Sequence, residues 1–502
     1  MLSIVFCYSF VSGQVTPPKN DGNSNAEDKI EKTAEQGDEN IDYDELQQQF
    51  EEFLKRPLNL NNAGYEALIQ SGLMDEILVN NLLNHIALNG RLIAIEELQS
   101  IPGFDVQTIE RIAPYVVTGS DEADLHLSFK QLMDAGSHQV LMRTGRVLNQ
   151  QAGYDVVDTS QSYYAGSPWN LYMRYRYSFS KKYSIGITAE KDAGEEFFKG
   201  SQPKGFDFYS AHFFVKDVGI FRKIAVGDYQ LEYGQGLNVW SGLAFGKSPD
   251  ITTTVRNARG LMPYTSVNEE SFRRGAAVSL GLHDFSLDVW YSNRKVDGNV
   301  LAQDSLQSEF IVSSLQTSGL HRTQTEIADK NSLGVQSIGT HLAYTTRKIE
   351  IGFTLSHIRF SNALQNTQSL YNQFQFEGDN FLNASVDYRF NIRNFNFFGE
   401  AARSNNNAYA FLNGVLFSPD PHIAISLLQR NYQRSYQAIE SNALRESNNF
   451  NEKGYMIGIN IKPTRQVGLS GYYDMFSFPW LKYQVNAPSV GYEYIMQLTY
   501  TP

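Results

Sequence analysis

The strongest candidates for function in this 502-residue sequence are charged side chains around one long glycine-rich stretch, 231–272. They are Arg256, Arg259, Glu269, Glu270, Arg273 and Arg274. A long loop that carries both charge signs can fold into a pore, where it narrows the passage and sets its selectivity. Alternatively, these charges pair with one another and plug the pore. Both interpretations require a barrel around the loop.

Other kinds of chemistry have little support in the sequence. The nine histidines are scattered, and neither a metalloprotease helix motif nor a nucleophile elbow is present. Gly234-Gln235-Gly236 lacks the spacing and the following Lys-Ser/Thr of a phosphate loop. The single cysteine, Cys7, excludes a disulfide framework and a zinc finger. We predict no enzymatic activity, no cofactor and no metal site, with a barrel enzyme assembled between loops as an alternative.

Alternating strands are the elements that would position these charges. In 382–390, Leu, Ala, Val, Tyr and Phe alternate with Asn, Ser, Asp and Arg, and roughly sixteen such segments follow residue 139. Tight turns between them alternate with long loops, which is typical of outer-membrane barrels. The sequence predicts a mainly β fold over residues 125–502, a transmembrane antiparallel β-barrel of about 16 strands.

Composition agrees with a barrel. Mean hydropathy is −0.36 and no run approaches 18 apolar residues, which excludes an α-helical membrane protein. Phe and Tyr nevertheless total 61 residues, 32 and 29 respectively. The strands of a soluble sandwich or propeller also alternate apolar and polar residues. The many rings and the regular exchange of short and long connections favour strands that face lipid.

The two ends of the chain raise separate expectations. Residues 1–14 resemble the apolar half of a secretory signal peptide without its basic start. The last two residues of the sequence, Thr501-Pro502, resemble the start of another turn. The sequence therefore predicts either a barrel completed by sixteen strands or a piece of a longer one.

The acidity of the protein lies in its N-terminal quarter. Of the formal net charge of −12, residues 15–56 carry −7 (12 acidic, 5 basic) and residues 57–118 carry −5 (7 acidic, 2 basic). Residues 15–42 are polar enough to form a disordered linker. Residues 43–118 show apolar spacing typical of short helices, with Gly72, Gly90 and Gly103 at the breaks.

This helical unit resembles a tandem helix-hairpin-helix domain of the ComEA-like kind, a family known for binding DNA. The resemblance is carried by Leu58-Asn59-Leu60-Asn61-Asn62-Ala63, by Asn89-Gly90-Arg91 and by Ile101-Pro102-Gly103-Phe104. It implies two hairpins, at Gly72-Leu73 and Gly103-Phe104. The second glycine of each is replaced, by Met74 and Asp105, and the unit is acidic, which opposes phosphate binding. A docking domain is therefore favoured over DNA capture during uptake.

The whole chain resembles Bacteroidetes envelope proteins that join a helix-hairpin-helix unit to a β-rich region. The matching segments are 227–229, 234–237, 240–242, 245–248 and 272–276. We therefore predict an outer-membrane barrel with a periplasmic docking domain, acting as a channel or as a scaffold for envelope machinery. Its expected partners are outer-membrane lipid and an envelope protein, with nucleic acid as the alternative.

Overall fold

A computed structural model of the chain describes most of the residues after position 56. The described ranges are 3–7, 50, 53–54, 57–119, 136–155, 162–179, 182–242, 244, 246–301, 311–346, 348–366, 369–464 and 466–500. The predicted linker at 15–42 and most of the predicted helix at 43–56 lie outside these ranges. Within them, no helix is long and apolar enough to cross a bilayer.

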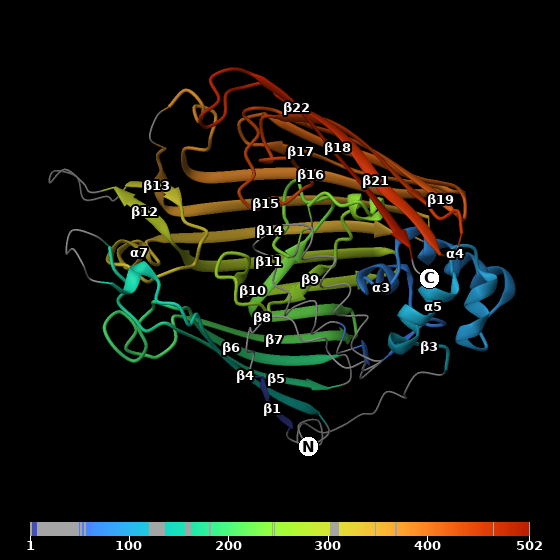
Figure 1. Ribbon diagram of the computed structural model, residues 1–502, viewed down its shortest axis with the longest axis horizontal. Helices are drawn as coiled ribbons and strands as arrows, with labels where there is room; N and C mark the ends of the chain where they lie inside the picture. Colours follow the sequence, from blue (N-terminus) through green and yellow to red (C-terminus); the bar gives the residue numbers. More distant parts are fainter. Residues whose placement is uncertain are drawn as a thin grey trace.

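Sixteen long strands within the described residues form one antiparallel meander, in which each strand pairs with the next (Figure 1). They are β4 (Ser137–Arg146), β5 (Trp169–Phe179), β6 (Tyr183–Lys191), β7 (Phe208–Val218), β8 (Phe221–Glu232), β10 (Arg273–Leu282), β11 (Phe285–Val296), β14 (Leu333–Thr345), β15 (Ile349–Leu364), β16 (Gly378–Ile392), β17 (Phe395–Ser404), β18 (Tyr409–Asp420), β19 (Ile423–Tyr432), β20 (Glu452–Ile461), β21 (Val467–Phe478) and β22 (Ser489–Tyr500). The predicted mainly β fold with about 16 antiparallel strands is confirmed.

The connections alternate in length, as predicted. At one end the strands are joined by tight turns, in which Asp217, His283 and Arg393 adopt the positive φ that such hairpins require. At the other end the loops hold elements of their own. These are η3 (Ala152–Tyr154), η4 (Ile251–Thr254), β9 (Gly260–Pro263), β12 (Gly298–Leu301), β13 (Ile311–Leu315) and α7 (Gln324–Asp329). Figure 1 shows α7, β12 and β13 at the left, opposite the N-terminal helices.

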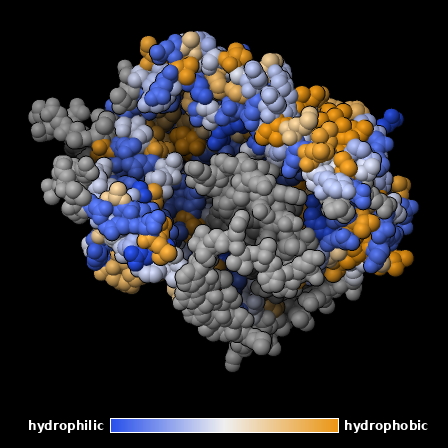
Figure 2. All heavy atoms as spheres, in the orientation of Figure 1, coloured by the Kyte–Doolittle hydropathy of each residue, from blue (hydrophilic) through white to orange (hydrophobic). Residues whose placement is uncertain are grey.

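The polarity of the two faces of the sheet is the reverse of that in a soluble protein: the outer face is apolar and the inner face is polar. Along β15, Ile351 and Phe353 on the outer face are 49% and 44% exposed, whereas Thr354 on the inner face is 1% exposed. The inner face of other strands buries charged residues such as Asp387, Glu400 and Arg430. In Figure 2, apolar residues gather at the upper right, over the ends of β18 to β22. Polar groups inside and apolar groups outside suit a sheet that is surrounded by lipid.

Within the described residues, the sheet curls around this polar interior without closing. β22 pairs with β21, and its alternate residues from Val490 to Tyr500 are 65–77% exposed on one face. The edge of β4 away from β5 is covered by β1 (Ser3–Cys7), which runs parallel to it. These five residues belong to the predicted signal peptide.

Within residues 57–119, the N-terminal unit has five helical segments around one apolar core. They are α3 (Tyr65–Gln70), α4 (Glu76–Asn89), η1 (Ile95–Ser100), α5 (Val106–Ile112) and η2 (Ala113–Tyr115). The prediction of an all-α unit is wrong in one detail. β2 (Leu58–Asn59) and β3 (Val116–Val117) pair in parallel, because the chain enters and leaves the unit side by side. Leu60, Leu68 and Leu98 are fully buried in its core.

Candidate functional site

The segment between β8 and β10 lies inside the curl of the sheet and reaches its opposite wall. The backbone N–H groups of Gln235 and Leu237 donate to Glu400 Oε2 on β17, at 2.7 and 2.9 Å. The N–H of Trp240 donates to the carbonyl oxygen of Glu440 at 2.8 Å. The segment therefore lies inside the curl of the sheet, where the carboxylate of Glu400 on the inner face accepts two of its backbone hydrogen bonds.

Three of the six predicted charged residues line this filled interior. Arg259 pairs with Glu232 at 2.5 Å, and Arg273 pairs with Glu440 at 2.5 Å. The backbone carbonyl of the buried Arg256 accepts a hydrogen bond from Arg389 at 3.1 Å. Arg259 and Arg273 thus pair with carboxylates outside the predicted set of six, and not with one another.

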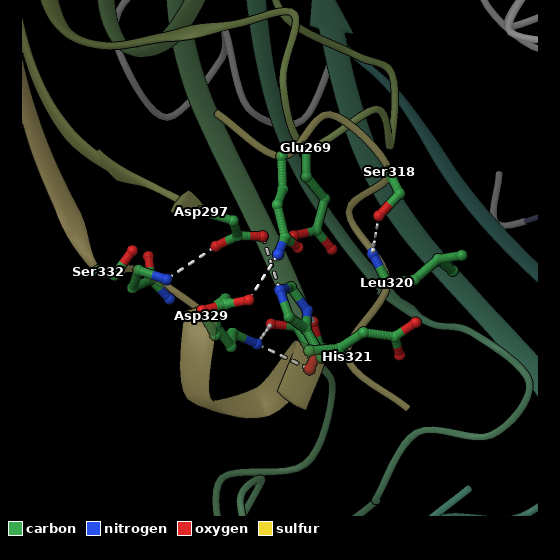
Figure 3. Close-up of polar contacts among 12 residues, drawn as sticks. Glu269, Asp297, Ser318, Leu320, His321, Asp329 and Ser332 are labelled. Carbon is green, nitrogen blue, oxygen red and sulfur yellow. Dashed lines mark hydrogen bonds and ion pairs between the residues drawn. The ribbon is translucent and has the colours of Figure 1, made fainter. Parts of the chain in front are cut away.

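The other three residues lie elsewhere, so the prediction of a single constriction is corrected. Arg274 forms a bidentate pair with Asp228, at 2.7 and 2.9 Å, and its side chain is 47% exposed. Glu269 and Glu270 lie near His321, in the long-loop end of the molecule (Figure 3). The six are close in sequence, but Glu269 and Glu270 lie at the long-loop end, apart from the arginines of the interior.

A buried charge network that sequence reasoning missed lies on β19 to β21. Arg430 pairs with Glu452 at 2.5 Å and with Asp474 at 2.8 Å, and all three side chains are at most 1% exposed. Asp474 also pairs with Lys247 of the inserted loop at 2.7 Å. Gly454, opposite Arg430, leaves the room that the guanidinium occupies. Polar positions in alternating strands were visible in the sequence, but the register that joins them was not.

The helical unit is seated on the tight-turn end of the sheet through polar contacts. Arg389 of β16 donates to the hydroxyl of Tyr65 at 3.2 Å and lies 3.9 Å from the carboxylate of Glu76. The side chain of Asn396 also hydrogen-bonds Glu76, which is 3% exposed. Asn391 donates to Asn80 at 3.1 Å. The unit thus covers one mouth of the curled sheet.

A cavity of about 1500 Å³ lies between the helical unit, the inserted loop and the strand ends. Residues 71–78 and 100–108, which include both predicted hairpins, line it on the helical side. Gly72 and Gly103 adopt positive φ there, while Leu73 and Phe104 pack into the core. The hairpins therefore face the sheet.

The hairpin helices already have carboxylates at their N-termini. Asp75 accepts from the N–H of Leu78 at 2.8 Å, and Asp105 accepts from the N–H of Thr108 at 2.7 Å. In the helix-hairpin-helix family, such N–H groups approach a phosphate. These capping carboxylates occupy that position and oppose an anion.

The two hairpin glycines predict a difference in stability. A Cβ at Gly103 would lie 2.9 Å from Leu78 Cδ2 at φ 88°, whereas one at Gly72 would meet nothing within 4 Å at φ 64°. Gly72→Ala is expected to cost about 1 kcal/mol through backbone strain alone. Gly103→Ala adds steric overlap and is expected to cost roughly 2–4 kcal/mol. Hydrogen exchange of the α5 amides in the whole protein measures the loss of stability in each variant. Equal protection of α5 in the two variants would contradict the larger cost expected for Gly103→Ala.

A second polar cluster surrounds His321 at the long-loop end (Figure 3). The imidazole hydrogen-bonds Asp207 through Nδ1 at 2.6 Å and Asp297 through Nε2 at 2.7 Å. Burial alone would lower the pKa of His321, but these carboxylates raise it to about 10. Burial and the nearby Asp207 raise the pKa of Glu269 to about 9. No spacing motif marks these residues, because they come from three different connections between strands, and the two that share one, Asp297 and His321, are far apart in it.

Comparisons with known proteins give distant likenesses only. No protein-family model matches the chain, and no curated protein sequence matches it. An anion-selective porin from Comamonas acidovorans is 10% identical with a TM-score of 0.31, and 66% of this chain and 87% of the porin are covered. OpdQ of Pseudomonas aeruginosa is 11% identical with a TM-score of 0.34, covering 66% and 80%. OmpT of Vibrio cholerae is 9% identical with a TM-score of 0.29, covering 67% and 90%. Because these TM-scores lie below 0.5, the fold rests on the chain's own strand pairing.

Proposed function

We propose that this protein is an outer-membrane β-barrel whose passage is closed from inside by the 233–272 segment and at the periplasmic mouth by the helical unit. The inverted sheet carries this proposal: its outer face is apolar and its inner face is charged. In lipid, exposed backbone groups must be paired, so such a sheet works only as a barrel. If the tight turns are periplasmic, as in known barrels, the helical unit lies in the periplasm.

Membrane insertion is tested directly. The protein is expected to stay in the outer-membrane fraction after carbonate extraction and to change its electrophoretic mobility on heating. Release into the soluble fraction, or identical mobility with and without heating, would refute the barrel.

The channel role is favoured because the contacts that close the mouth are polar. Interfaces between parts that separate are more polar than permanent ones. Arg389, Asn391 and Asn396 meet Tyr65, Glu76 and Asn80 there. Movement of the helical unit would open the cavity to the periplasm, and withdrawal of the inserted loop would complete the passage.

Single-channel recording on the whole protein tests this gate. Glu76→Lys places a cation against Arg389 and is expected to raise the frequency of openings at least tenfold over wild type. Glu110→Lys is the matched control, since Glu110 is exposed on α5 and should leave the openings unchanged. If neither wild type nor Glu76→Lys conducts, the channel role is wrong.

A scaffold role has one supporting observation of its own. Leu88 and Ile93, which flank Gly90 between the two halves of the unit, are 84% and 90% exposed. Exposed apolar side chains on a docking unit suit a protein partner. Affinity purification from outer membranes should recover that partner with wild type and lose it with Leu88→Ser/Ile93→Ser. DNA capture has less support, and a duplex that fails to bind at low salt would end that alternative.

A further inference from the structure

We propose that His321, Asp297 and Glu269 form a site for a divalent transition-metal cation of the zinc type, at the long-loop end of the molecule. Glu269 comes from the β8–β10 loop and the other two from the β11–β14 connection, and each offers one ligand atom within 4.8 Å of the other two (Figure 3). The site is independent of the channel proposal, because it lies at the end opposite the helical unit.

The first support is the way in which His321 is held. Its Nδ1 lies 2.6 Å from Asp207 Oδ2, and the other oxygen of Asp207 pairs with Lys330 Nζ at 2.7 Å. A carboxylate anchored in this way orients the ring and leaves Nε2 facing Asp297. Metal-binding histidines commonly show this arrangement, in which the second ring nitrogen donates to a carboxylate.

The second support is the partner of Nε2. Asp297 Oδ2 lies 2.7 Å from it, while Asp297 Oδ1 accepts from the N–H of Asn331 at 2.7 Å. A cation bound between Nε2 and Asp297 Oδ2 would take the place of the proton in this hydrogen bond, since metal binding releases protons from its ligands. Zinc bonds to both atoms would place them roughly 3.3 Å apart, so a small side-chain shift suffices.

The third support is Glu269. Its carboxylate has no hydrogen-bonding partner among the described residues, and it points toward His321. The side chains of His321 and Asp207 are 1% exposed, and that of Asp297 is 9% exposed. Buried carboxylates normally pair with a cation or bind a metal. Glu195 adds to the negative charge, since its carboxylate accepts from the backbone N–H of His321 at 2.9 Å.

The donor set selects the class of metal. One imidazole nitrogen and two carboxylates suit zinc and similar transition ions, whereas calcium and magnesium prefer oxygen ligands alone. The ligands lie in the β8–β10 loop, directly after β11 and before α7. Because Asp297 and His321 both belong to the β11–β14 connection, a bound ion would join two long loops across this end of the sheet.

The test is zinc titration of the whole protein in detergent, purified without a histidine tag and stripped with a chelator. Calorimetry should give one zinc per chain, with calcium binding at least 100-fold weaker. Glu269→Gln keeps the size of the side chain and is expected to weaken zinc binding at least tenfold. Asp207→Asn should weaken it 10–100-fold through the orientation of His321.

Matched controls separate the site from general effects. His422→Gln removes a histidine from an exposed pair with Asp420 at the other end of the molecule. Glu326→Gln removes a carboxylate that caps α7 close to the site. Both should bind zinc as wild type does. Absence of stoichiometric zinc binding by wild type would overturn the proposal and leave His321 as an imidazolium held by two aspartates. Wild-type affinity in Glu269→Gln would overturn the ligand assignment.

Discussion

Replacing Arg430 by methionine is expected to cost about 3–5 kcal/mol in the free energy of unfolding. Arg430 is the shared partner of Glu452 and Asp474, and none of the three side chains is more than 1% exposed. Without the guanidinium, Asp474 would keep its pair with Lys247, whereas Glu452 has no other ion pair among the described residues. The N–H groups of Glu446 and Ser447 donate to Glu452 but do not neutralise it.

Urea titration of the reconstituted protein, followed by heat-modifiable mobility, measures this loss. The triple variant Arg430→Met/Glu452→Gln/Asp474→Asn should recover most of it, because it removes the uncompensated charges together with the arginine. Arg403→Met, at an exposed position on β17, is the matched control and should change stability by less than about 0.5 kcal/mol. A single Arg430→Met variant as stable as this control would show that the network contributes nothing.

Placing an arginine on the outer face of β15 is expected to destabilise the protein in a depth-dependent manner. Phe353 lies on the outer face, 44% exposed, near the middle of the part of the strand that would cross the bilayer. Phe353→Arg should cost about 2–4 kcal/mol in lipid, because a charge there loses its hydration. Ile349→Arg lies on the same face at the tight-turn end and should cost only about 0–1 kcal/mol.

The comparison between these two variants discriminates a membrane barrel from a soluble sheet. On a water-exposed surface, both arginines would be tolerated equally, within about 0.5 kcal/mol of wild type. Unfolding titrations in vesicles therefore decide the matter, and a Phe353→Arg variant as stable as Ile349→Arg would refute the lipid-facing assignment of this strand.

Several features were predictable because they depend on neighbours in the sequence. Alternation along 382–390 fixes which side chains share a face, since successive residues in a strand point to opposite sides. Turn residues such as His283 and Arg393 mark where strands reverse. The helical unit followed from apolar spacing and glycine breaks. Its two-residue strand pair did not, because Leu58 and Val116 come together only when the unit is packed.

The site residues also divide into those that the sequence predicted and those that it did not. The sequence indicated that a charged loop enters the interior, and Arg256, Arg259 and Arg273 are there. It grouped Glu269 and Glu270 with them because they are close in the chain, whereas the path of the loop carries the acidic pair to the far end. No sequence pattern marked His321, since Asp207 belongs to another loop and Asp297 lies 24 residues away in the same connection.

By itself, the sequence determined the apolar outer face and polar inner face of the sheet, the alternation of short and long connections, and the acidic helical unit. Each of these depends on local properties: the period of the apolar residues, the turn residues and the charge. Only the tertiary structure decided that the interior is filled, that the helical unit sits on the tight-turn end, and that His321 lies among carboxylates. Each depends on strand register and loop path, which bring together residues such as Gln235 and Glu400 that are far apart in the chain. The chain adopts the packing in which its buried charges find partners. Residue spacing in the sequence does not show which residues those partners are.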